Sequence, residues 1–458
     1  MARASEDARF DPRAVPFLIV AALALVSDGY DLAAMGYVAP ELGKAWKLLP
    51  GAFVPAFSAA IIGMMIGGPL LGALGDRYGR KRLILAGLAL IAVVTLATAG
   101  VRSTGELVAL RFVTGLGLGG VIPNVGALVA EMTPARFRGR VLVIVTMGVP
   151  LGIALPGLVA ATLLPVWGWR ALLIVGGLLP LAVALAAMFV LPESSQFLAL
   201  RRAPKPGASP GGFADLFAGD LAIVTPLLWL CQATNQMANF FALTWLPTLL
   251  SGAAAGGHGS PIASLFSLGG LISGLALLFV LDRLGTAPVL LLFIAGAPLV
   301  AGMAMADLPP AVHALVIAGA GLCVTGVQIG ITALLGIVYP TPIRSAGTGW
   351  TQAAGRVGAL AAPLVGGWLL GLHVPLQRLP LAPAVLMVVG ALACAVLAWR
   401  FHRRFGSFRA GEFTPSPKGP RPKRRCARRS IWRAERRRRS LAACDEMSAQ
   451  NLTDTRPP

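Results

Sequence analysis

The chain has 458 residues, of which 56% are hydrophobic and only 13% charged, and its mean hydropathy is +0.76. Soluble domains carry about a quarter charged residues, so this composition excludes an ordinary soluble globular protein. The five cysteines lack the spacing of disulfides or metal ligands, and we expect neither a metal site nor a cofactor. The apolar runs contain no nucleophile–base set, which argues against an enzyme.

Apolar runs long enough to cross a bilayer, about 17–25 residues each, recur along most of the chain. Their continuous hydrophobicity indicates helices rather than the alternating strands of an outer-membrane barrel. We therefore predict an all-α membrane protein with twelve transmembrane helices. The predicted spans are residues 14–38, 53–75, 83–100, 106–130, 140–165, 169–192, 222–250, 262–281, 286–306, 311–338, 345–370 and 380–400.

The net charge of +20 is concentrated at the C-terminus, where residues 401–458 hold 16 Lys/Arg and 5 Asp/Glu. Such a basic run is compatible with nucleic-acid binding or with an incidental extension of the reading frame. Because it lacks apolar periodicity and interleaved aromatics, we expect a disordered tail near anionic lipid and no nucleic-acid partner. The loops after even-numbered spans, such as "DRYGRKR" and "ARFRGR", are also basic, which predicts that both termini are cytoplasmic.

An internal repeat divides the spans into two sets of six. Asp76-Arg77-x-Gly79 recurs 206 residues later as Asp282-Arg283-x-Gly285, and Pro134 and Arg138 of "TPARFR" match Pro340, beside "TPIR", and Arg344, its last residue, at the same offset. Two matches at one offset indicate two related six-helix halves. The predicted organisation is an N-terminal half (1–192), a cytoplasmic linker rich in Pro and Gly (193–220), a C-terminal half (221–400) and the basic tail (401–458).

The stretch "GALGDRYGRKR" (72–82) resembles the signature loop between helices 2 and 3 of the major facilitator superfamily. The resemblance implies two six-helix halves that rock around a central cavity, with this loop acting as a gate. Acidic and basic residues of the neighbouring loops are expected to join it in a cluster of ion pairs that opens in one transport state. The predicted cytoplasmic gate consists of Gly75, Asp76, Arg77, Gly79, Arg80, Glu131, Arg138, Asp282, Arg283 and Arg344.

Three further stretches narrow the resemblance: "DGYD" in the first span, residues 111–140 across the fourth, and residues 339–367 across the eleventh. Together they are similar to the aromatic acid:proton symporters. This resemblance implies a carrier in the bacterial inner membrane that imports benzoate-type anions with protons by alternating access. A monomer is expected to suffice for function. The long basic tail has no counterpart in the pattern of that family.

Asp28 and Asp31 are the carboxylates that fall well inside a predicted span. Burial of a carboxylate in a membrane is costly, so these two are candidates for proton coupling, for a structural ion pair or for both. With a rise of 1.5 Å per residue, Asp31 lies about 24 Å from the start of its span, and Arg111 lies about 7–8 Å below the opposite surface. We therefore expect an Asp31–Arg111 pair. Either aspartate can carry the proton, and Asp31 is favoured.

A carboxylate substrate needs a cation, and Arg356 is a basic residue near the predicted midplane. A guanidinium matches a carboxylate bidentately, although packing against backbone carbonyls is an alternative role. Polar and aromatic residues of neighbouring spans are candidates for stacking and hydroxyl recognition. The predicted substrate contacts are Arg356, Asn235, Gln236, Trp245, Gln328 and Gln352, with Trp350 as a further aromatic candidate.

We conclude from the sequence that the chain is a proton-coupled importer of small organic anions, most consistent with aromatic carboxylates. Carriers of aliphatic acids or sugars and drug exporters use the same fold and remain alternatives. A membrane sensor that does not transport, with the basic tail as its output, is an alternative from another class.

Overall fold

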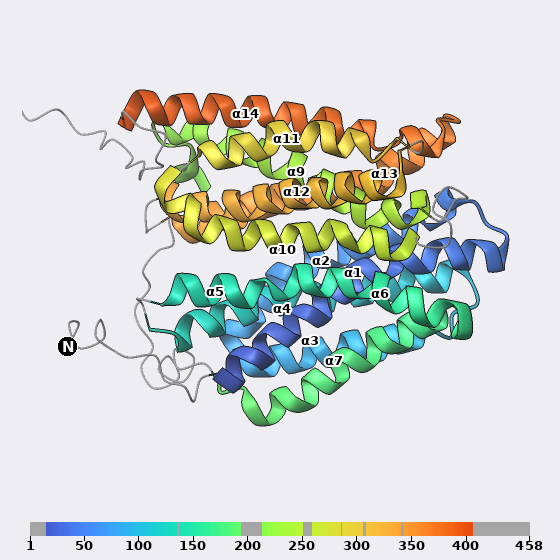
Figure 1. Cartoon of the computed structure of the whole chain (residues 1–458). Coiled ribbons are helices and arrows are strands. Elements are labelled where there is room, and N and C mark those ends of the chain that lie inside the picture. Colours follow the sequence, from blue (N-terminus) through green and yellow to red (C-terminus); the bar gives the residue numbers. More distant parts are fainter. Residues whose placement is uncertain are drawn as a thin grey trace, which may run out of the picture. The chain divides into compact units, whose positions relative to one another are not determined.

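The computed structural model describes seven segments of the chain, and every regular element in them is a helix (Figure 1). The helices all belong to one compact unit, residues 1–414. The described segments are residues 15–134, 137–193, 213–250, 259–284, 286–305, 308–339 and 343–405.

The first half contains seven helices, because two of them share one crossing of the membrane. Nearly all residues of these helices are apolar, which suits a bilayer. The helical conformation pairs the backbone N–H and C=O groups within each helix, as a bilayer requires. The helices are α1 (Val15–Trp46), α2 (Val54–Tyr78), α3 (Arg80–Thr98), α4 (Thr104–Met132), α5 (Arg138–Thr146), α6 (Gly148–Trp167) and α7 (Arg170–Val190), with the short 3₁₀ helix η3 (Pro50–Phe53) before α2.

The second half repeats this plan with six long helices. A 3₁₀ helix, η4 (Phe213–Phe217), precedes the first of them, and η6 (Leu376–Arg378) precedes the last. The long helices are α9 (Leu221–Leu250), α10 (Gly259–Leu284), α11 (Ala287–Gly302), α12 (Pro310–Val338), α13 (Arg344–Gly371) and α14 (Leu381–Phe405).

These helices make twelve crossings, as the sequence predicts. In the described residues nine segments are both long and apolar enough to cross, and shorter apolar segments lie in α10 and α11. The twelfth crossing, α9, is 30 residues long but carries amide side chains at Gln232, Asn235 and Gln236. Polar residues in a crossing are tolerated where they face the interior of the bundle, which fits the burial of these three.

Three helix boundaries differ from the sequence-based expectation. The fifth crossing is interrupted at Met147, between α5 and α6, because Pro150 has no N–H to donate to the preceding turn. The first helix continues through Pro40 to Trp46, since loss of a single hydrogen bond does not end a helix that neighbours support. The last helix runs to Phe405, past the predicted boundary at residue 400.

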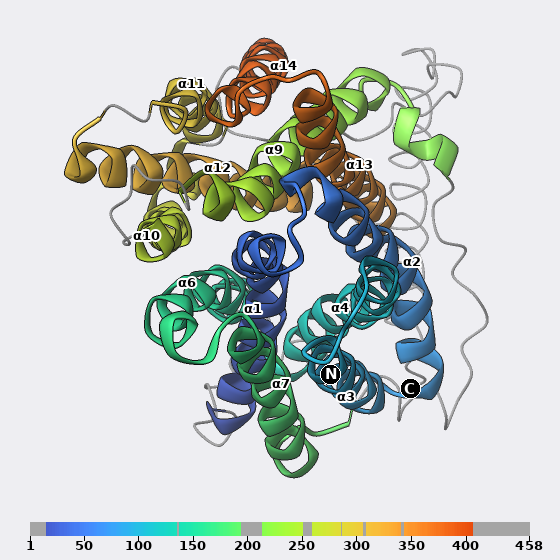
Figure 2. The same ribbon diagram turned by 90° about the vertical axis from the view of Figure 1, so that its right-hand side faces the viewer.

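The helix bundle has two ends, which we call the basic end and the far end. The basic end carries Val15, the α2–α3 turn at Gly79 and Phe405; the far end carries Trp46 and Thr104. Figure 2 shows that three helix pairs join the halves: α1 with α9, α6 with α10, and α2 with α13. Helix α1 lies at the centre and also contacts α4, α6 and α7, so its middle is buried on every side.

Candidate functional site

The centre of α1 carries two buried carboxylates. Asp28 is 0% exposed and Asp31 is 2% exposed, three residues apart on a helix whose other central residues are small or apolar. The two side chains have different surroundings. Asp31 points to its own half of the molecule, whereas Asp28 interacts electrostatically with a residue of the other half.

Asp31 forms an ion pair with Arg111 of α4, in agreement with the depth argument from the sequence. Nη1 of Arg111 donates to Oδ2 at 3.0 Å and Nη2 donates to Oδ1 at 3.4 Å, while Thr95 of α3 donates to Oδ1 at 2.8 Å. Arg111 is itself only 2% exposed. In a buried bidentate pair of this kind, removal of either partner would leave an uncompensated charge.

Asp28 differs, because neither of its carboxylate oxygens has a hydrogen-bond partner among the described residues. The opposite charge that acts on it is Arg356 of α13, with which it interacts electrostatically across the interface of the halves. Arg356 is half-buried, and its Nη1 lies 3.6 Å from Sδ of Met64 on α2. An unpartnered carboxylate and a weakly bonded guanidinium therefore face each other from opposite halves.

Amide side chains gather beside Arg356 in the second half. Gln232 donates to Oε1 of Gln352 at 3.0 Å, and Asn235 donates to Oε1 of Gln328 at 3.3 Å. Within the described residues the amide oxygens of Gln232, Asn235 and Gln236 accept no hydrogen bond, although all three side chains are buried. We call these five residues the amide cluster. Unpaired buried acceptors are costly, so the cluster is suited to bind a donor.

The amide cluster adjoins Arg356 along α13. A Cβ atom on Gly355 would lie 2.8 Å from Cγ of Gln232 and 3.1 Å from Cγ of Gln236, so the absence of a side chain there lets α9 and α13 pack closely. Sequence reasoning predicted Asn235, Gln236, Gln328 and Gln352 but missed Gln232. The spacing of Gln232 and Gln236, one helical turn apart, is a signal that would have found it.

The two tryptophans predicted as substrate contacts lie elsewhere. Trp245 is buried, its Nε1 donates to the carbonyl of Ala362 at 3.4 Å, and it is about 13 Å along α9 from Gln236. Trp350 is 47% exposed and stacks on Trp229 with ring centroids 6.1 Å apart. Neither indole belongs to the amide cluster, because each packs against other partners, Trp245 on Ala362 and Trp350 on Trp229.

Part of the predicted gate is assembled at the basic end. Arg80 forms an ion pair with Glu131 of α4. The backbone N–H of Lys81 donates to Oε1 of Glu193 at 3.1 Å, which places a carboxylate at the N-terminus of α3, where the helix dipole favours it. Gly79 has φ +105°, and a Cβ atom there would lie 2.7 Å from Glu193, so this turn requires glycine.

The other gate positions are less connected. Gly75 packs on Asn124, since a Cβ atom would lie 2.0 Å from its amide oxygen. Arg77 lies over the ring of Tyr78 at 5.4 Å, and Arg344 donates to the carbonyl of Tyr339 at 3.1 Å. The predicted side chains of Asp76, Arg138, Asp282 and Arg283 lie outside the part of the chain whose side chains the structure describes.

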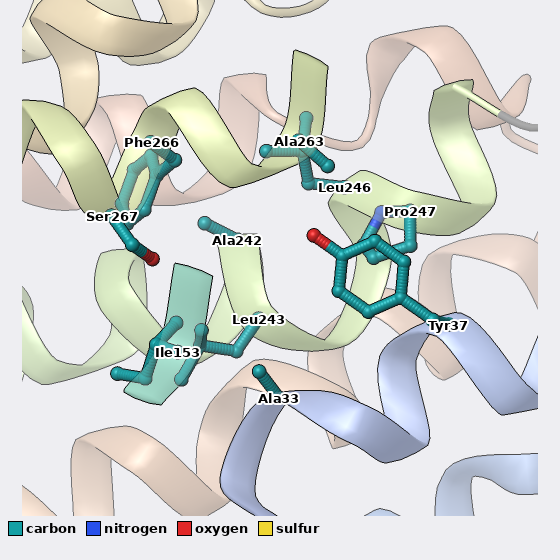
Figure 3. A pocket seen from close by; sticks show the side chains of 10 residues that line it. All are labelled: Ala33, Tyr37, Ile153, Ala242, Leu243, Leu246, Pro247, Ala263, Phe266 and Ser267. Carbon is teal, nitrogen blue, oxygen red and sulfur yellow. The ribbon is translucent and has the colours of Figure 1, made fainter. Parts of the chain in front are cut away.

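The far end is closed where α1 crosses α9. A Cβ atom on Gly36 would lie 2.2 Å from the carbonyl oxygen of Leu243, so the two backbones are in contact. Figure 3 shows the adjacent pocket, where Tyr37 and Ala33 of α1 face residues of α9 and α10. This pocket measures about 10 Å³, enough for a water molecule and far too small for an aromatic ring. Tyr37 is also hydrogen-bonded to Ser264 of α10 across the interface. We call this region the constriction.

Two six-helix halves, a buried charged group between them and a constriction that closes one end together define a membrane transporter that works by alternating access. In the residues that the structure describes, no His, Cys, Asp and Glu side chains cluster as metal ligands. A sequence profile described as Major Facilitator Superfamily matches residues 17–340 and 228–444. The chain therefore belongs to the major facilitator superfamily.

Relatives of known function agree with this family. The chain is 34% identical over 401 residues to the 4-hydroxybenzoate transporter PcaK of Pseudomonas aeruginosa, which covers 81% of this chain and 88% of the relative. It is 33% identical over 388 residues to a gallate transporter of Pseudomonas putida, and the match covers 78% of this chain and 86% of that relative. It is 34% identical over 389 residues to the 3-(3-hydroxy-phenyl)propionate transporter of Escherichia coli, covering 83% and 93%.

The fold also matches a solved transporter. A crystal structure of a D-xylose–proton symporter superposes with a TM-score of 0.68 at 18% sequence identity, covering 84% of this chain and 97% of that chain. At this identity the likeness concerns the fold alone. The family profile and the relatives, which are transporters, show that the protein is a multi-pass membrane transporter and not an enzyme.

Proposed function

We propose that this chain imports small aromatic carboxylates together with protons. The observation that carries the proposal is the unpartnered Asp28 carboxylate, buried opposite Arg356 at the interface of the two halves. The relatives are named for the transport of hydroxybenzoate, gallate and hydroxyphenylpropionate, all aromatic acids. A carrier for such anions needs a cation for the carboxylate and a group that takes up a proton, and this site offers both.

Arg356 is the proposed anchor of the substrate carboxylate. Its guanidinium has donors to spare, since the contact from Nη1 is a long one to the sulfur of Met64. Three amide oxygens of α9 have no donor among the described residues, and two of their side chains, Gln232 and Gln236, pack on Gly355, the neighbour of Arg356. A phenolic hydroxyl of the substrate would satisfy one of these oxygens. Sites that bind a substrate hydroxyl in this way discriminate strongly against analogues that lack it, because the buried acceptor is then left unpaired.

Asp28 is the proposed proton carrier. The Asp31 carboxylate accepts three hydrogen bonds, and neutralising it would leave Arg111 buried without its counterion. Protonation of Asp28 disrupts no hydrogen bond among the described residues. This geometry supports Asp28 as the proton carrier rather than Asp31, which the sequence alone favoured, and we propose that the Asp31–Arg111 pair holds α1 against α4.

Asp28 and Arg356 together suggest how proton and anion are coupled. While Asp28 is ionised, it attracts the guanidinium and competes with the substrate carboxylate. Once Asp28 is protonated, Arg356 is left with excess positive charge and binds the anion more tightly. Proton and substrate then favour each other's binding, as linkage requires.

We further propose that the basic end faces the cytoplasm of a bacterial inner membrane. The basic loops and the basic start of α3 support this orientation by the positive-inside rule. The closed constriction at the far end then corresponds to a conformation that faces the cytoplasm. The Arg80–Glu131 pair, together with the other gate residues, would rearrange as the halves rock.

Uptake into proteoliposomes tests the proposal. Radiolabelled benzoate, 4-hydroxybenzoate and gallate are offered with an acidic exterior and with equal pH on both sides. We expect accumulation of at least one of them, driven by the pH gradient and lost in Arg356→Ala, with weaker binding in Arg356→Lys. The proposal is wrong if the intact protein accumulates none of the three, or if accumulation is the same without the gradient.

A further inference from the structure

A second cavity lies at the far end, on the outer side of the constriction. Its volume is about 370 Å³, within the range of sites for small organic ligands. It lies between the last turns of α1, the 3₁₀ helix η3 and the last turns of α9. Its wall includes Lys44, Lys47, Phe53, Phe57, Thr244 and Trp245.

Lys47 occupies a backbone conformation that normally calls for glycine. Its φ is +56°, in the left-handed region, and the N–H of Leu48 donates to the carbonyl of Gly43 at 2.9 Å. This is the Schellman ending of a helix, in which the residue at the position of Lys47 is usually Gly. A lysine in this conformation is strained relative to glycine, and a role for its ammonium group would explain why the position is a lysine.

The cavity combines positive charge with aromatic walls. Lys44 is bonded to Glu41 at 2.7 Å, so this pair contributes little net charge, whereas Lys47 adds a positive charge at the rim. Among the aromatic residues of the lining, Phe57 is half-buried and offers apolar surface, whereas Phe53 and Trp245 are almost fully covered by their neighbours. A lining that combines an ammonium group with an aromatic ring suits a flat ring that carries one carboxylate.

We propose that this cavity is an entry site that holds an aromatic carboxylate at the far end before the constriction opens. The identity of the ligand class rests on the proposed function. Two residues of the lining, Thr244 and Trp245, follow Leu243 in α9, and the carbonyl of Leu243 contacts Gly36. A bound anion would therefore lie immediately outside the point where α1 crosses α9. Such a site raises the local concentration of substrate and thereby the rate of its capture.

Kinetics with Lys47 variants test this entry site. In Lys47→Gln we expect the KM for 4-hydroxybenzoate to rise about three- to tenfold at low ionic strength with Vmax unchanged, and the difference to shrink as salt screens the charge. Lys47→Arg should keep the original KM. The matched control is Arg102→Gln, an exposed charge at the same end that does not line the cavity.

A labelling experiment gives a direct readout of occupancy. In Lys47→Cys, a membrane-impermeant maleimide added from outside should react more slowly as 4-hydroxybenzoate is raised, whereas Arg102→Cys should show no protection. The entry site is overturned if Lys47→Gln and Arg102→Gln have the same KM as the intact protein, or if no protection is found. Absence of any uptake by the intact protein would instead contradict the proposed function, so the two failures are distinguishable.

Discussion

The two halves of the molecule differ in how completely their buried polar side chains are hydrogen-bonded. In the first half, both carboxylate oxygens of Asp31 accept hydrogen bonds, three in all, from Arg111 and Thr95. In the second half, Gln232, Asn235 and Gln236 each keep an amide oxygen that accepts nothing from the described residues. Asp28 belongs to the first half by sequence but shares this unpaired state.

This difference in hydrogen bonding distinguishes residues that hold the helices in place from residues suited to bind substrate or a proton. In the Asp31–Arg111 pair both carboxylate oxygens are bonded and Nε of Arg111 alone has no partner among the described residues, so breaking the pair costs much and we expect it to fix the position of α1. Unpaired acceptors and an unpaired carboxylate gain from a ligand or a proton, because binding supplies the missing donor. The substrate and the proton are therefore expected to act on Asp28, Arg356 and the amide cluster.

Arg111→Gln should have the largest effect, because it leaves the Asp31 carboxylate buried without its counterion. We expect the free energy of unfolding to fall by about 3–5 kcal/mol, measured as a lower thermal midpoint in detergent. Asp31→Asn should cost a similar amount, and the double variant Asp31→Asn/Arg111→Gln clearly less than the sum of the two. Strict additivity would show that the pair does not hold α1 in place.

Asp28→Asn sharpens the comparison between the two aspartates. We expect the variant to fold with an unchanged or higher thermal midpoint, because it removes a buried charge that has no hydrogen bond among the described residues. Uphill accumulation of substrate under a pH gradient should be lost, while exchange of labelled for unlabelled substrate continues. Proton-driven accumulation at the original level would assign the proton to another group.

Gln236→Leu tests whether the second half recognises the hydroxyl group of the substrate, and its expected effect is smaller than those of the preceding variants. The change removes one unpaired acceptor and replaces it with apolar surface of similar volume. We expect preference to shift from 4-hydroxybenzoate toward benzoate by about tenfold in Vmax/KM, which is about 1.4 kcal/mol. Gly51→Ala, which meets nothing within 4 Å, provides the neutral control. An unchanged ratio would exclude Gln236 from hydroxyl recognition.

Tyr37→Phe should have the smallest effect, because it removes only the hydrogen bond to Ser264 that crosses the interface. One such bond contributes about 0.5–1.5 kcal/mol, so closure of the far end should weaken a few-fold. The measurement is the labelling rate of Ala33→Cys, a residue of the constriction, by an impermeant maleimide, which should rise. A rate equal to that in the Tyr37-containing background would show that the bond does not hold the end closed.

Much of the fold follows from the sequence because the bilayer constrains it strongly. The twelve apolar runs, the repeat offset of 206 residues and the rise of a helix predict the crossings and bring Asp31 level with Arg111. The interruption at Met147 was not predicted, because one proline in a long apolar run usually bends a helix without dividing it.

The site was harder to predict than the fold. Spacing alone predicts that Asp28 and Asp31 share one face of the helix, but it does not show which neighbouring residue each one contacts. Thr95 carries no signal in the sequence, since a threonine in an apolar helix usually bonds to its own backbone. The prediction that Trp245 contacts substrate had a similar weakness. Its indole N–H donates to the backbone carbonyl of Ala362, and a pattern of side chains does not reveal a backbone partner.

The proline in α1 has a mechanical consequence. Because Pro40 has no N–H, the carbonyl of Gly36 lacks its partner within the helix, at the very residue that touches Leu243. The segment from Pro40 to Trp46 is thus attached to the rest of α1 by a weakened joint, while Arg111 clamps the part nearer the basic end. The α1 residues of the constriction, Ala33, Gly36 and Tyr37, precede Pro40, whereas the last turns of α1 lie beyond it, line the far-end cavity and lead to Lys47. Pro40→Ala should stiffen this joint, seen as a narrower distribution of distances between spin labels at Lys44→Cys and Arg102→Cys.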